Sequence, residues 1–143
     1  NLSKRQVRSP KVYLRDSGLL HALLGLESLA DIECHPKVGA SWEGFAATQV
    51  IHHLRAPSRD CYFWATHSGA ELDLLVVRGN RRLGFEFKRT AAPRRTRSMA
   101  IAMADLKLDS IDVIYAGDEV FPIGEGIRAV GLGHITGSLA PIR

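Results

Sequence analysis

Three residues on neighbouring predicted strands have the side chains of a phosphodiester-cleaving site. Asp73 lies in one apolar segment, and Glu86 and Lys88 lie two positions apart in the next. Residues i and i+2 of a strand point to the same face, so Glu86 and Lys88 project together. The turn at 79–80 separates the two segments, with Asp73 and Glu86 at similar distances from it. We therefore expect the two carboxylates to meet across the sheet, with Cβ atoms ~5 Å apart.

The expected cluster matches the chemistry of a divalent cation site. Two nearby carboxylates repel each other, and burial makes their ionisation harder still, so that a hard cation between them relieves both effects. Mg²⁺ or Mn²⁺ takes such oxygen ligands, and a water that it acidifies can attack a phosphodiester. Lys88 would stabilise the charge that develops on phosphorus, or orient or deprotonate the water. The alternative is a structural ion pair at the sheet face.

A third acid lies upstream on a predicted helix, residues 40–55. At 100° per residue, Glu43 shares one direction with Ala47, Val50 and Leu54, an otherwise apolar stripe. Glu43 could complete an acidic pocket with Asp73 and Glu86. It could equally be an acid that the helix macrodipole favours near the helix N-terminus.

The elements that position these residues form a mixed α/β pattern. Strand patterns over 61–67, 71–77 and 81–88 predict an antiparallel meander. Before it we expect an extended segment, a leucine-rich helix that Asp16 or Ser17 caps and Gly25 stops, and a loop over 28–39. Ser41 would cap the helix over 40–55, and Pro57 would end it. After the meander we expect a basic loop, a helix over 99–108, a buried strand over 111–117 and two short closing strands. The fold class is α/β, with helices flanking a sheet.

Composition places the chain among ordinary globular domains. Its 143 residues suit one domain and one core, and its hydrophobic fraction is 45%. The two cysteines, Cys34 and Cys61, lie far apart and fit neither a zinc site nor a disulfide framework. The apolar runs are too short for a transmembrane helix, and no leader pattern opens the chain, so we expect a cytoplasmic protein.

Basic residues follow the acidic cluster directly. The net charge is +4, and the stretch "KRTAAPRRTRS" holds five basic residues in eleven. This stretch predicts a phosphate track for DNA or RNA, formed by Arg89, Arg94, Arg95 and Arg97. The alternative is a solvated loop. Aromatic side chains in the strand over 61–67 could stack bases but are more often core; His67 is the histidine nearest the cluster in sequence, and Glu71 is an acid without an assigned role.

The order of these motifs resembles a known family. Asp73 followed by Glu86-Phe87-Lys88, with the upstream Glu43, is similar to the PD-(D/E)xK, or restriction-endonuclease-like, superfamily. The chain resembles most closely the uncharacterised domain that ends a large family of prokaryotic AAA-type ATPases. The resemblance runs from residue 4 to about 135 and rests on "KVYLRDSGLLHALLG", "SWEGFAATQV", "FWATHSGAELDLLV" and "FEFKRT".

The resemblance implies a fold, a set of roles and a context. It implies a restriction-endonuclease-like fold, with Asp73, Glu86 and the Phe87 carbonyl as ligands of Mg²⁺ or Mn²⁺, and Lys88 as the catalytic lysine. Glu43 would be the helical acid of the site. Leu72 stands where the superfamily pattern has proline. Residues 1–11 would be the end of a preceding winged-helix segment, and 12–143 a single nuclease-like domain.

Two functions from different classes remain open. The first is metal-dependent hydrolysis of DNA or RNA by a domain attached to an ATPase module in the same polypeptide. This sequence contains no G-x-x-x-x-G-K-[ST] phosphate loop of its own. The second is a non-catalytic module that uses the same fold to bind nucleic acid, to dock its own ATPase or to dimerise. The sequence does not decide between DNA and RNA, and it leaves the oligomeric state open.

Overall fold

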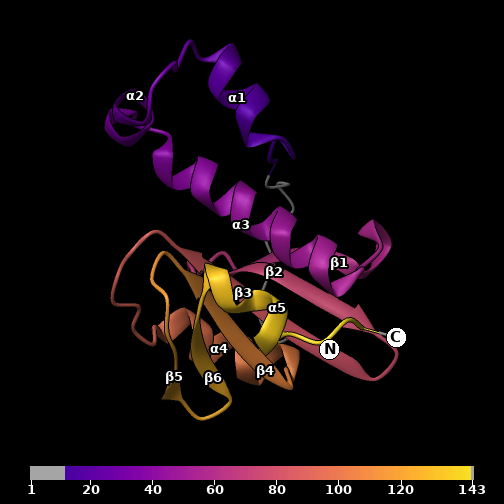
Figure 1. The fold of residues 1–143 in the computed structure, drawn as a ribbon. Helices are drawn as coiled ribbons and strands as arrows, with labels where there is room; N and C mark the ends of the chain where they lie inside the picture. The colour runs from indigo at the N-terminus through magenta and orange to yellow at the C-terminus, as the bar shows by residue number, and fades with distance from the viewer. Residues whose placement is uncertain (1–11, 143) are drawn as a thin grey trace.

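A six-stranded mixed sheet organises residues 12–142, the part of the chain that this computed structural model describes. The expectation that residues 1–11 end a winged helix lies outside the described residues. The strand order is β1-β2-β3-β4-β6-β5 (Figure 1). The strands are β1 (Cys61–Ala65), β2 (Glu71–Arg78), β3 (Arg81–Lys88), β4 (Ser110–Tyr115), β5 (Val120–Gly124) and β6 (Ile127–Gly131).

The predicted antiparallel meander is confirmed. β1 pairs with β2, and β2 with β3, in antiparallel register. β3 then pairs with β4 in parallel, and β4 with β6 in parallel, while β5 closes the sheet antiparallel to β6. The sheet is therefore mixed, and the carboxyl ends of β3, β4 and β6 lie at one edge, where Lys88 stands beside Tyr115.

Helices cover both faces of the sheet because the central strands are apolar on both sides. On one face, α3 (Val38–Leu54) packs Val50 and Leu54 against Phe85 and Phe87 of β3. On the other face, α4 (Arg97–Leu106) contributes a second core. Its buried residues Met99, Ala102 and Leu106 pack with Leu72, Ile111 and Val113. Alternation along β3 places Glu86 and Lys88 on the α4 side, opposite the two phenylalanines.

Two short helices precede α3 and lie apart from both cores. They are α1 (Ser17–Leu23) and α2 (Leu29–Cys34), and neither has a buried residue. Figure 1 shows them at one end of α3, away from the sheet. The predicted cap and stop of α1 are confirmed, since the Asp16 side chain accepts from the Leu19 N–H and Gly25 has a φ of 68°.

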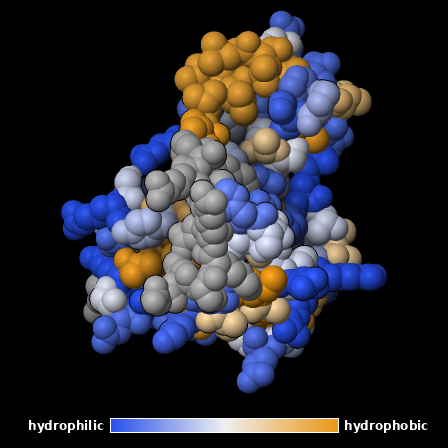
Figure 2. All heavy atoms as spheres, turned by 180° about the vertical axis from the view of Figure 1, so that it is seen from behind, coloured by the Kyte–Doolittle hydropathy of each residue, from blue (hydrophilic) through white to orange (hydrophobic). Residues whose placement is uncertain are grey.

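The leucines of α1 do not form a core stripe. Leu23 is 70% exposed, as is Leu29 of α2, and Leu19 is 53% exposed. Figure 2 shows apolar side chains gathered at the α1–α2 end of the molecule. The helical period was therefore predicted correctly, but the burial that it implied was not.

Three expected boundaries are wrong. The loop expected over 28–39 contains α2, which a capping box between Ser28 and Asp31 begins. α3 begins at Val38, after Lys37, so Ser41 is not its cap. α4 begins at Arg97 because Thr96 caps it, so the basic loop ends two residues earlier than expected.

The chain after β6 returns to the α3 face. A short 3₁₀ helix, η2 (Leu132–His134), leads into α5 (Ile135–Ser138). Arg128 of β6 binds the buried Asp112 of β4 and also donates to the Ser138 carbonyl at 2.9 Å. A second 3₁₀ helix, η1 (Ser58–Asp60), joins α3 to β1. Between residues 12 and 142, none of the helices has the length and apolar character to span a bilayer.

Candidate active site

Asp73 lies at an irregularity of the sheet. Tyr62 of β1 pairs with Leu75 of β2, but Trp64, two residues on, pairs with Leu72, three residues back. β2 therefore carries one residue more than β1 in this interval, and the interval contains Asp73. Such a bulge redirects side chains and is frequent beside functional sites.

The backbone of β3 holds the Asp73 carboxylate in place. The regular β2–β3 pairing reaches Leu74 and Phe85, the residue before Glu86. Beyond this pair, the Phe87 N–H donates to Asp73 Oδ2 at 3.1 Å. The carboxylate thus takes a position that a backbone carbonyl has in a regular ladder, which fixes it beside Glu86.

The structure brings Asp73, Glu86 and Lys88 together at the carboxyl end of β3. Lys88 Nζ lies 2.8 Å from Glu86 Oε2 and 3.8 Å from Asp73 Oδ2. The side chains of Asp73 and Glu86 are only 2% and 3% exposed, whereas that of Lys88 is 37% exposed. Of the three side chains, only that of Lys88 is accessible to solvent, and its ammonium lies beside both buried carboxylates.

Burial and charge oppose each other at Glu86. Burial is the main reason that the pKa of Glu86 is raised from 4.5 to about 7, and the charge of Asp73 raises it further against the effect of Lys88. At Lys88, burial lowers the pKa, but the charges of Glu86 and Asp73 outweigh burial and raise the pKa above its ordinary value. The cluster therefore favours a cation beside the two carboxylates.

Glu43 reaches the cluster from α3. Its charge contributes to the raised pKa of Lys88, so the carboxylate lies near the ammonium. The Tyr13 hydroxyl donates to Glu43 Oε2 at 2.9 Å. Glu43 is thus a neighbour of the Asp73–Glu86–Lys88 cluster, anchored by a residue thirty positions earlier in the chain.

Asp73 and Glu86 could act as metal ligands, but they do not form a complete metal site by themselves. Within residues 12–142, no three His, Cys, Asp or Glu side chains are arranged to hold a metal ion. Glu86 Oε1 is buried and has no hydrogen-bond partner among these residues. A buried oxygen without a partner is costly, and a cation would satisfy it. Asp73, Glu86 and a backbone carbonyl suit Mg²⁺ or Mn²⁺, which keeps waters as its other ligands.

The predicted phosphate track lies on the surface next to the cluster. Arg89, Arg94, Arg95 and Arg97 are all exposed, the last as the first residue of α4. Arg89 pairs with Glu33 of α2 at 3.5 Å. Arg95 packs its stem over Gly124 of β5, where an added Cβ would lie 3.0 Å from Arg95 Cδ. Arg89, which follows Lys88 directly, therefore lies on the α2 side of the cluster, whereas Arg95 reaches β5, three strands away from β3 in the sheet.

A family model matches residues 38–135, more than half of the chain, and is described as "Domain of unknown function (DUF4143)". The chain belongs to this family. The DUF4143 match includes Glu43, Asp73, Glu86 and Lys88.

Two curated relatives are similar to nearly the whole chain. They are uncharacterised proteins of Mycobacterium bovis and Mycobacterium tuberculosis, each 47% identical over 141 residues, or 97% of this chain. The chain spans only 32% of the length of each relative. No solved structure matches the chain.

Other predicted residues of the DUF4143 chain lie in less specific surroundings. Glu71 is an exposed acid at the start of β2, and His67 is exposed in the turn before it. Tyr62 is 50% exposed and donates to the Arg59 carbonyl, whereas Trp64 is core. Trp64 thus matches the core alternative for the aromatic residues of this strand, whereas the half-exposed Tyr62 does not.

Sequence reasoning missed two residues that contact members of the candidate site. Tyr13 lies in a segment without periodicity, and Glu33 lies in the undetected helix α2. Both act through partners far along the chain, at Glu43 and Arg89. No local signal identifies such pairs.

Proposed function

We propose that the Asp73–Glu86–Lys88 cluster is the active site of a PD-(D/E)xK-type nuclease domain that hydrolyses phosphodiesters in DNA or RNA. The observation that carries this proposal is the convergence of two buried carboxylates and a solvent-reaching ammonium at one strand end. The mixed sheet between helices is compatible with a restriction-endonuclease-like fold.

Asp73, Glu86 and the Phe87 carbonyl would hold Mg²⁺ or Mn²⁺. Such an ion, when bound, makes a coordinated water acidic enough to attack phosphate. Glu86 Oε1, which lacks a hydrogen-bond partner within residues 12–142, supports this role. The Asp73 carboxylate keeps its orientation through the Phe87 N–H.

Lys88 would supply positive charge at the reacting phosphate. Its partly exposed ammonium can contact a substrate while its stem remains beside both acids. Such a fixed cation stabilises the charge that grows on phosphoryl oxygens. Glu43 would help to orient the ammonium, and Arg89, Arg94, Arg95 and Arg97 would bind neighbouring phosphates.

The longer relatives support a context for this activity. About two thirds of their length lies outside the matched region, since the chain covers 32% of them. With the resemblance to domains that end AAA-type ATPases, this supports a nuclease-like domain working beside an ATPase module of one cytoplasmic polypeptide.

A second candidate function is binding without cleavage. It is favoured by the position of Lys88, whose ammonium lies 2.8 Å from Glu86 Oε2 and balances the charge of this carboxylate. A domain of this kind would bind nucleic acid or its own ATPase through the same surface.

A cleavage assay with matched variants separates the two functions. Labelled single-stranded and duplex DNA and RNA are incubated with the chain and Mn²⁺ or Mg²⁺. We expect Asp73→Asn and Lys88→Met to lose at least about 100-fold in cleavage rate, while binding measured in EDTA persists. Asp73→Asn keeps an oxygen that can accept from Phe87.

Glu125→Gln is the matched control, since it removes an exposed acid from the β5–β6 turn, at the opposite end of the sheet. Its cleavage should equal that of the native chain. Nucleic-acid binding without metal-dependent cleavage in any of these conditions would leave the binding module as the function.

A further inference from the structure

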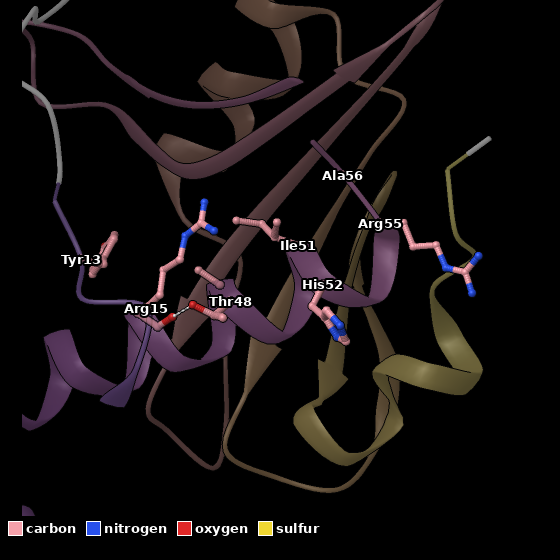
Figure 3. Close-up of a pocket in the computed structure, with 9 residues that line it drawn as sticks. Tyr13, Arg15, Thr48, Ile51, His52, Arg55 and Ala56 are labelled. Carbon is pink, nitrogen blue, oxygen red and sulfur yellow. Dashed lines mark hydrogen bonds between the residues drawn. The ribbon is translucent and has the colours of Figure 1, made fainter. Parts of the chain in front are cut away.

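A groove runs along one side of α3, where that helix borders the core that packs on the sheet. Its volume is about 710 Å³, and one wall is the extended segment that precedes α1. Figure 3 shows Tyr13 and Arg15 on this segment, Thr48, Ile51 and His52 along α3, and Arg55 at the helix end. Neither of the two functions above assigns a role to this groove.

Small residues create the groove. Gly44 and Ala47 line the groove near the middle of α3, and their small size leaves space above the helix. An added Cβ at Gly44 would lie 3.1 Å from Tyr13 Cδ1. The Thr48 hydroxyl donates to the Gly44 carbonyl at 2.8 Å, which holds it against the helix. The groove therefore follows the helix axis for roughly three turns, or ~16 Å from Gly44 to Arg55.

The charged side chains among the described lining residues of the groove are basic. Arg15 and Arg55 are exposed and border it, and His52 lies between them, whereas no Asp or Glu is among its described lining residues. An Arg15 guanidinium nitrogen donates to the Ser58 hydroxyl at 3.1 Å, which keeps this side chain beside the groove without neutralising it. This surface favours an anionic ligand.

Tyr13 links the groove to Glu43, the helical acid of the proposed nuclease site. This residue lines the groove, and its hydroxyl donates to Glu43 Oε2 at 2.9 Å. The groove therefore begins beside the helical acid of that site.

We propose that this groove binds the phosphate backbone of a single nucleic-acid strand on its way to or from Lys88. The proposal rests on the proposed function, because it extends the substrate of the same site. Phosphates would contact Arg15 and Arg55, and the small residues of α3 would admit the sugar backbone close to the helix. One helix and one extended segment form the walls of the groove. A groove of this kind suits a single strand rather than a duplex.

Binding of a labelled single-stranded oligonucleotide, measured by fluorescence anisotropy in EDTA, tests the proposal without requiring cleavage. We expect Arg15→Glu combined with Arg55→Glu to weaken binding at least tenfold and to lower the salt slope of log K by about 1.4, the value for two phosphate contacts on a single strand. Arg15→Gln combined with Arg55→Gln removes the two charges without reversing them. Its salt slope should be lowered as much as that of the double glutamate variant.

Arg81→Glu is the control for charge alone, because Arg81 is exposed at the start of β3, far from Lys88. It should change affinity much less than the groove variants. An equal effect of Arg81→Glu, or unchanged affinity of both groove variants, would overturn the proposal.

A photo-crosslinker placed at Thr48 identifies the occupant directly. We expect it to capture the oligonucleotide, and salt to suppress this product. Capture of residues 1–11 or of a second copy in the presence of oligonucleotide would instead assign the groove to that segment or to a dimer, and would overturn the proposal.

The outcomes separate the groove from the catalytic site. Groove-dependent binding without any metal-dependent cleavage keeps the groove and rejects the nuclease. Cleavage that needs Asp73 and Lys88 but ignores both arginines keeps the nuclease and rejects the groove.

Discussion

The carboxylate of Glu86 lies in a buried position that disfavours its charged form. Its side chain is 3% exposed, and one of its oxygens lacks a hydrogen-bond partner within residues 12–142. Natural proteins keep such strained groups mainly where function requires them, at a cost to stability. Ionisation of Glu86 should therefore lower the free energy of unfolding of the metal-free domain. The size of this loss should depend on pH.

The sign of this dependence follows from the raised pKa of Glu86, about 7 in the fold against an ordinary 4.5. Between these values the folded state binds more protons than the unfolded state, so stability falls as pH rises through this window. The loss is at most about 3 kcal/mol for a shift of this size. We expect Glu86→Gln to gain about 1–3 kcal/mol relative to the native chain between pH 5 and pH 8, measured by urea unfolding in EDTA.

Glu125→Gln is again the suitable control, since this acid is exposed in the β5–β6 turn. Its difference from the native chain should stay constant over the same pH range. The free energy of unfolding of Glu86→Gln relative to the native chain could instead stay constant or shrink as pH rises. That result would show that the fold does not raise the pKa of Glu86.

Among the elements, β3 has the tightest packing requirement. Gly84 faces the α4 side, where an added Cβ would lie 2.8 Å from Leu108 Cδ1 and 3.0 Å from Ile111 Cγ1. The strand can approach the segment between α4 and β4 only because this position has no side chain. β3 is also the strand that carries Glu86 and Lys88, so its position sets that of the site.

Gly84→Ala should therefore destabilise the domain by about 1–3 kcal/mol through overpacking. Urea unfolding at one pH measures this change. Gly133→Ala, where nothing lies within 4 Å of an added Cβ, should change stability by less than about 0.5 kcal/mol. Equal effects of the two substitutions would mean that β3 can move away from Leu108 at little cost.

The parts of the fold that were predictable from sequence are those that local period determines. Alternation in β3 separates Phe85 and Phe87 from Glu86 and Lys88, so the faces of this strand follow from four consecutive residues. The turn at 79–80 then sets the pairing of β2 with β3, which brings Asp73 near Glu86.

The remaining features depend on contacts that no local pattern encodes. The bulge containing Asp73 arises from the pairing of β2 with β1, and Tyr13 meets Glu43 across thirty positions. α2 has six residues, too few for an apolar period, and is set by its capping box. The leucines of α1 recur with a helical period, but the period alone does not say whether another element covers them.

At the scale of the whole molecule, stability is unevenly distributed. The two cores join α3, α4 and the sheet, and they contain every fully buried large side chain of the described residues. The α1–α2 arm contributes no buried residue to either core. Isolated helices of this length are marginal in water, so the arm depends on its caps and on few contacts with α3.

Hydrogen exchange followed by mass spectrometry should therefore find two levels of protection. We expect the amides of α1 and α2 to exchange by local opening, at least about 100-fold faster than those of β3 and β4, which should exchange near the limit of global unfolding. Gly84→Ala supplies the control, since it should speed exchange in β3 and β4 and leave the already fast α1 unchanged. Protection of α1 equal to that of β3 would mean that the arm and the sheet unfold as one unit, and that the exposed leucines are covered in solution.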